Sequence, residues 1–69
     1  MARILLSKSD DYAGALRQSL NLLHDKKIAV RPGTKLLTRY AVIVVDDVAV
    51  DDSIELLRGA NLNATKDGG

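Results

Sequence analysis

The segment from Ala41 to Val45 constrains this chain more than any other stretch of its sequence. All five residues are apolar and four of them are β-branched. Residues of this kind favour strands, and a strand that is apolar on both faces is usually central in its sheet and covered on both sides. Two aspartates follow the run and end it. We therefore expect a buried central strand here, with a layer of structure on each of its faces.

Two segments before this strand also carry clear patterns. Residues 3–7 are typical of a short strand, and two aspartates then favour the start of a helix, because carboxylates stabilise its positive end. Between Tyr12 and Leu23, large apolar residues recur at spacings of four, four and three. This spacing predicts an amphipathic helix of about four turns, which ends near residues 24–27.

The middle and the end of the chain give weaker signals. Residues 28–30 predict a second strand, and residues 31–34 predict a turn, because a proline presets φ and the glycine after it permits a positive φ. The chain is then expected to be extended up to the strand at Ala41. Residues 52–60 predict a short second helix, and residues 63–69 have the polar, glycine-rich composition of a flexible C-terminal tail.

The resulting order, β-α-β-β-α, predicts one small α+β domain over residues 1–62, in which a single helix layer lies on a short sheet. A chain of 69 residues buries only about 60% of its unfolded surface. It contains no Cys, so neither a disulfide nor a thiolate metal site can add stability. One helix layer covers one face of the sheet, whereas Ala41–Val45 needs cover on both. We therefore expect a homodimer to complete the fold.

Charge is divided unevenly along the chain. Residues 1–40 hold eight Lys and Arg against three Asp, a net charge of +5. Residues 41–69 hold two Lys and Arg against six Asp and Glu, a net charge of −4, so the overall value of +1 conceals two opposite halves. Each half is suited to a partner of the opposite charge.

The basic half contains a set of cations with an aromatic residue beside it. Such a set is suited to phosphate groups, with the aromatic ring available for stacking on a base, or to an acidic protein face. The sequence pI of about 8.1 is below the value of about 9 that is typical of nucleic-acid-binding domains. The candidate partner or phosphate-binding residues are Lys26, Lys27, Arg31, Lys35, Arg39 and Tyr40.

The acidic half contains five carboxylates around the expected strand end and the start of the second helix. Several carboxylates can bind Mg²⁺ or Ca²⁺, but the spacing here does not match an EF-hand loop, and carboxylates are favoured at a helix N-terminus in any case. We expect no metal site, and interpret the group as an acidic face for a protein partner. Its members are Asp46, Asp47, Asp51, Asp52 and Glu55.

No motif in the chain indicates catalysis or a cofactor. The single histidine, His24, has no second histidine or nucleophile near it in the sequence, and no apolar run approaches the ~20 residues that span a bilayer. We therefore predict a small, cytoplasmic, non-enzymatic regulatory or inhibitory adaptor that binds a larger protein through its charged faces. The alternative is a nucleic-acid-binding dimer that uses Lys26 to Arg39. A ribbon-helix-helix arrangement is the less favoured version of that alternative.

Overall fold

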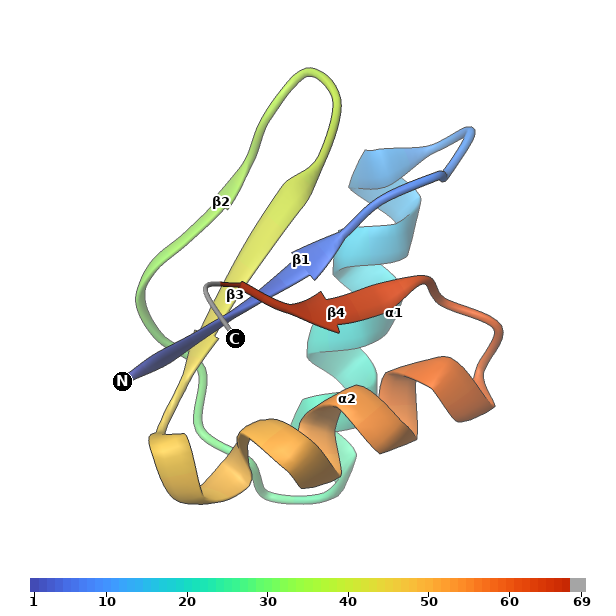
Figure 1. Cartoon of the computed structure of the whole chain (residues 1–69). Coiled ribbons are helices and arrows are strands. Elements are labelled where there is room, and N and C mark those ends of the chain that lie inside the picture. Colours follow the sequence, from blue (N-terminus) through green and yellow to red (C-terminus); the bar gives the residue numbers. More distant parts are fainter. Residues whose placement is uncertain (68–69) are drawn as a thin grey trace.

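The elements follow one another in the order β-α-β-β-α-β. The computed structural model describes residues 1–67 and shows two helices and a four-stranded sheet (Figure 1). This arrangement confirms the α+β class that the sequence predicts. In chain order the elements are β1 (Ala2–Leu6), α1 (Tyr12–Asp25), β2 (Arg31–Leu36), β3 (Ala41–Val45), the 3₁₀ turn η1 (Asp47–Ala49), α2 (Val50–Gly59) and β4 (Ala64–Lys66).

The sheet has the strand order β2-β3-β1-β4, and every neighbouring pair is antiparallel. β1 lies between β3 and β4, with Ile4 opposite Ile43 and Leu6 opposite Ala64. The two β-α-β units of the chain are therefore split, because each has a strand of the other unit inserted between its own two strands. The hairpin that joins β2 to β3 extends beyond the rest of the sheet in Figure 1.

The strand expected at Ala41–Val45 is present, and all five of its residues are buried. The extended chain expected from Lys35 is instead interrupted by a turn at residues 37–40. Alternate side chains of a strand point to opposite faces of the sheet. Ala41, Ile43 and Val45 belong to the main core cluster, together with Ile4 and Leu6 of β1. The buried side chains of α1 and α2 complete this cluster, so both helices cover the same face of the sheet.

The opposite face of β3 is buried without a second chain. Val42 and Val44 are only 4% and 6% exposed, although neither belongs to the core cluster under the helices. A Cβ built on Gly33 would come within 3.1 Å of Val44 Cγ2, which shows that the backbone of β2 passes directly over this valine. The strand therefore needs no partner subunit for its burial, and this reason for expecting a dimer no longer applies. Dimerisation itself stays a prediction.

The predicted strand over residues 28–30 and the predicted turn over residues 31–34 are wrong, because the strand β2 covers Arg31–Leu36. Arg31 lies opposite Val44 and Lys35 opposite Val42, so residues 32–34 together face Ile43. The Pro-Gly signal thus marks a bulge inside a strand rather than a turn between strands. A proline is tolerated here because β2 is an edge strand, where a missing N–H need not break a ladder hydrogen bond.

A C-terminal strand is also missing from the sequence interpretation. Ala64–Lys66 forms β4, which pairs with β1, and Ala64 is fully buried. The Ser7 N–H donates to the Asn63 carbonyl over 3.1 Å, and the Asp67 N–H donates to the Arg3 carbonyl over 2.9 Å. The expected tail over residues 63–69 is therefore corrected to a strand at 64–66, while residues 68 and 69 lie outside the described part of the chain.

Both helices end in the same local motif. Lys27 (φ 59°) and Asn61 (φ 64°) adopt left-handed conformations just after α1 and α2. The next N–H in each case donates back into the helix, from Ile28 to the Leu23 carbonyl over 2.9 Å and from Leu62 to the Leu57 carbonyl over 3.0 Å. These are Schellman motifs, which fold the residue after the helix back onto its last apolar turn.

The helix bounds differ little from those expected. α1 runs two residues further than the apolar spacing indicates, and α2 covers Val50–Gly59 instead of 52–60. Neither of these two helices has the length and the apolar character that a membrane crossing requires.

Candidate functional site

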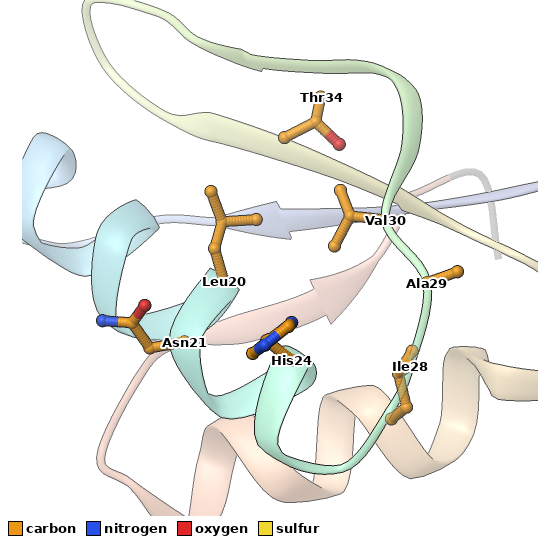
Figure 2. Close-up of a pocket in the computed structure, with 7 residues that line it drawn as sticks. All are labelled: Leu20, Asn21, His24, Ile28, Ala29, Val30 and Thr34. Carbon is orange, nitrogen blue, oxygen red and sulfur yellow. The ribbon is translucent and has the colours of Figure 1, made fainter.

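A groove of about 440 Å³ lies between α1 and the segment that leads into β2 (Figure 2). Leu20 and Val30 lie across from each other in it, and His24 and Ile28 lie toward the end where α1 stops. The lining is mainly apolar, with an amide, an imidazole and a hydroxyl at its margins. Its residues are Leu20, Asn21, His24, Ile28, Ala29, Val30 and Thr34.

The apolar spacing predicts Tyr12, Leu16, Leu20 and Leu23 as the buried face of α1, but of these only Leu23 is fully buried. The fully or nearly buried positions of the helix are Ala15, Ser19 and Leu23, spaced four residues apart. Buried Ser19 donates its hydroxyl proton to the Ala15 carbonyl over 2.7 Å, so the polar group is satisfied within the helix. Ala15 and Leu23 belong to the core cluster, whereas Leu20 is only half-buried and forms one wall of the groove.

The second wall depends on the Schellman turn and on the bulge. The Schellman turn after α1 returns Ile28 to the core, and Val30, which is 36% exposed, follows at the entry to β2. In the bulge, the Thr34 hydroxyl oxygen accepts a hydrogen bond from the Val44 N–H over 3.0 Å. It thus takes the place of the backbone carbonyl that would accept this N–H in a regular strand pair. Leu36 lies opposite core residue Ala41, and it stays half-exposed on the helix side of the sheet. The helix side of β2 is therefore apolar and incompletely covered.

A second hollow of about 360 Å³ begins on the other side of Ile28. It lies between the end of α1 and the outer face of α2, and it is lined by Lys26, Ile28, Asp52 and Leu56. Ile28 belongs to both hollows, so they lie next to each other, and the second one has Lys26 and Asp52 among its lining residues. Of the four Lys and Arg between His24 and Leu36, Arg31 is paired with Asp46 and Lys35 lies on the opposite face of the sheet. Lys26 and Lys27, which follow α1, are therefore the cations nearest to the groove.

The structure does not bring the predicted basic residues together as one patch. Lys26 and Lys27 follow α1 near the groove, whereas Lys35 and Tyr40 line a hollow on the opposite face of the sheet. Arg39 is exposed in the turn between β2 and β3. The expected phosphate-tracking surface from Lys26 to Arg39 is thus divided between the two faces of the sheet.

Arg31 is engaged with the acidic half of the chain. Its Nε and Nη2 donate to the two carboxylate oxygens of Asp46 over 3.0 and 2.8 Å. The hydrogen bonds from Arg31 hold the pKa of Asp46 below its usual value, and the same bonds raise the pKa of Arg31. The two halves, which are separate in sequence, are therefore joined by a bidentate ion pair at the end of β3.

The remaining acidic residues do not converge on one point either. Asp47 lies 3.3 Å from the Met1 ammonium, Asp51 and Asp52 occupy the first turn of α2, and Glu55 is exposed on that helix. Within residues 1–67, no three side chains of His, Cys, Asp or Glu gather where a metal ion could bind. These carboxylates lie where the helix N-terminus and nearby cations favour negative charge.

The hollow on the face of the sheet opposite the helices measures about 230 Å³ and was not anticipated as a unit. Arg3 Nη2 lies 2.7 Å from Asp67 Oδ2 in an ion pair at its side. Sequence reasoning missed these residues because they come from opposite ends of the chain and meet only through strand pairing. Its lining consists of Arg3, Leu5, Lys35, Tyr40, Val42 and Asp67.

Comparisons with protein-family models, with curated proteins and with solved structures find no match to this chain. Its function is therefore inferred from its own surface, where the two main features are the groove beside α1 and the hollow on the opposite face of the sheet.

Proposed function

We propose that this chain is a non-enzymatic regulatory or adaptor domain that docks an acidic, apolar segment of a larger protein in the groove between α1 and β2. The supporting observation is an apolar groove, lined by Leu20, Ile28 and Val30, with two lysines following it at the end of α1. Lys26 lines the neighbouring hollow, which shares Ile28 with the groove, and its ammonium can pair with a carboxylate of the incoming segment.

The groove is better suited to a protein segment than to a small molecule. Small-molecule sites usually bury 70–90% of the ligand surface, whereas four of the seven residues that line this groove are themselves exposed. An apolar side chain that enters such a depression, with polar and charged groups at the rim, has the anatomy of a protein–protein hot spot.

A second copy of the chain is a poor occupant for this groove. A two-fold symmetric contact beside β2 would bring two copies of the same surface together, each with Lys26 and Lys27 near the groove and no cluster of carboxylates among the described residues that line it to pair with them. Addition of a strand to β2 is also disfavoured along the bulge, because Pro32 lacks an N–H and the bulge distorts the edge. The partner therefore docks through its side chains and carries the opposite charge.

Two valine substitutions provide a matched test. Val30→Asp places a carboxylate in the groove, whereas Val48→Asp places one on η1, where Val48 is 92% exposed and lines none of the three hollows. The probe is a fluorescein-labelled nine-residue peptide of alternating Glu and Leu, and a peptide of alternating Lys and Leu is its control. We expect Val30→Asp to weaken binding of the acidic peptide at least tenfold, about 1.4 kcal/mol. Val48→Asp should leave the affinity within about twofold.

The same pair of variants extends the test to the native partner. Material captured from the native cell with the unmodified chain, after nuclease treatment, should be retained by Val48→Asp and lost with Val30→Asp. Binding should also weaken as salt rises, because ion pairs at the exposed rim are screened over about 8–10 Å. Loss of binding with Val48→Asp alone would assign the partner to the acidic face around η1 and overturn this proposal. Equal binding of the acidic and the basic peptides would do the same.

A further inference from the structure

The open face of the sheet carries an ordered set of side chains that the proposed protein docking does not use. In the strand register, Val42 of β3 lies between Leu5 of β1 and Lys35 of β2, and Thr65 of β4 lies on the far side of Leu5. Residues directly opposite in neighbouring strands point to the same face. One row across all four strands therefore has two apolar side chains in its centre, a cation at one end and a hydroxyl at the other.

Tyr40 stands beside this row. It lies two residues before Val42, so it has the same orientation along the extended chain, and it lines the same hollow as Lys35 and Leu5. The tyrosine is 41% exposed, whereas Val42 beneath the hollow is almost fully buried. The hollow thus has an apolar floor and an accessible aromatic ring at its margin. This combination suits a planar aromatic group, because such a group can stack on the ring while its lower edge covers the apolar floor.

Two cations on this face are placed to bind an anion attached to that group. Lys35 lines the hollow at the β2 side, and Arg3 lines it from β1. The Arg3 side chain is 63% exposed even though its Nη2 is held by Asp67 over 2.7 Å. A guanidinium has five N–H donors, and the carboxylate leaves some of them available for phosphate oxygens. The carboxylate itself only accepts hydrogen bonds, so it can bind an amino group on the ligand.

Each of these features matches one part of a nucleotide: the aromatic ring matches the base, and the cations match the phosphate. We infer that the open face of the sheet binds a nucleotide unit, with its base stacked on Tyr40 above Leu5 and its phosphate held by Lys35 and Arg3. Asp67 accepts a hydrogen bond from an amino group of the base, which favours adenine, guanine and cytosine over uracil and thymine. A free nucleotide and an unpaired nucleotide of a single strand share this chemistry. A duplex does not, because its bases are already stacked.

The tyrosine itself provides the signal for a binding assay. The chain has two tyrosines and no tryptophan, so Tyr12→Phe leaves Tyr40 as the only tyrosine in the molecule. Tyr12 belongs to α1, on the other side of the sheet. The probes are guanosine monophosphate, an eight-residue single-stranded RNA of mixed G and C, and the same RNA as a duplex. We expect saturable quenching of Tyr40 fluorescence by the first or the second probe and none by the duplex.

Comparison of the mononucleotide with the single-stranded RNA identifies the source of the ligand. Binding of the RNA at least tenfold tighter than the mononucleotide indicates a single strand, and equal affinities indicate a free nucleotide. A single-stranded ligand should also show a log–log salt slope of about −0.7 for each phosphate contacted, and Lys35→Gln should reduce that slope by about one contact.

Substitution of the ring tests whether stacking is responsible, with anisotropy of a labelled probe as the readout. Tyr40→Ala should weaken binding at least fivefold, and Tyr40→Phe should retain the affinity within about twofold. The groove variant Val30→Asp should bind the nucleotide normally, so this inference and the proposed docking can fail separately. Quenching by none of the probes at millimolar concentration would overturn the inference. An unchanged affinity of Tyr40→Ala would also overturn it.

Discussion

Replacement of Ala64 by aspartate distinguishes most sharply between an ordered β4 and a flexible tail. Ala64 is fully buried against β1, next to Leu6, and its carbonyl accepts a hydrogen bond from Arg58 Nε over 2.9 Å. The neighbouring Thr65 is exposed on the other face of the same strand. The same substitution at both positions therefore changes only the side of the strand on which the carboxylate lies. In a flexible tail, the two variants would behave alike.

The magnitude follows from the cost of keeping the buried carboxyl neutral. An aspartate with an ordinary pKa near 3.9 must be protonated about three pH units above that value to remain neutral at pH 7, which costs about 4 kcal/mol. A domain of this size has a total stability of roughly 3–10 kcal/mol. Ala64→Asp should therefore lower the melting temperature by at least about 16 °C or unfold the chain at pH 7. Thr65→Asp should cost about 1 kcal/mol or less.

The pH dependence provides a second measurement if Ala64→Asp does not fold at pH 7. Burial raises the pKa of the introduced carboxyl in the folded state above its value in the unfolded state. The folded state then binds more protons, so the penalty appears as pH rises above about 4 and shrinks as pH falls toward it. Thermal unfolding followed by circular dichroism at pH 4 and pH 7 should show partial recovery at pH 4. Equal melting temperatures of the two variants at pH 7 would refute the assignment of Ala64 to the core.

The remaining predictions concern the bulge and the ion pair beside it. Gly33→Ala should destabilise the fold by about 1–3 kcal/mol, because Gly33 has φ 108° and its new Cβ would lie 3.1 Å from a valine methyl group. In Gly59→Ala the new Cβ has no atom within 4 Å, so this variant should be neutral or stabilising by up to about 1 kcal/mol. Urea titration of both variants measures the difference. Thr34→Val should cost about 1–3 kcal/mol because it leaves the Val44 N–H without its acceptor, whereas Thr34→Ser should retain most of the stability. The lowered pKa of Asp46 contributes stability above the unfolded value, near 3.8, which is lost as pH falls through the folded value. Asp46→Asn should therefore reduce the loss of stability between pH 5 and pH 2, and an unchanged loss would contradict the role of this pair.

Local patterns in the sequence were sufficient for the elements that carry large apolar side chains. The run Ala41–Val45 is a strand, as predicted, and the helix predicted from Tyr12 to Leu23 is present over Tyr12–Asp25. Five β-branched or small apolar residues in succession, and apolar residues at helical spacing, each indicate one type of structure almost regardless of their surroundings. The buried face of α1 was less predictable. Its most deeply buried positions include Ala15 and Ser19, and a small or polar residue does not appear as a buried position in a pattern of large apolar residues.

Only the tertiary structure decided the two edge strands and the candidate sites. β2 contains Pro32 and Gly33, which indicate a turn when read locally, and β4 is short and polar. Both become strands because β3 and β1 offer them unpaired backbone groups, and such pairing depends on residues far away in the chain. The same pairing brings Arg3 to Asp67 and Arg31 to Asp46, and it separates Lys35 from Lys26. The sequence by itself thus determined the α+β class, the central strand and the opposite charges of the two halves. The arrangement of those charges on the surface depended on strand register, which no local pattern encodes.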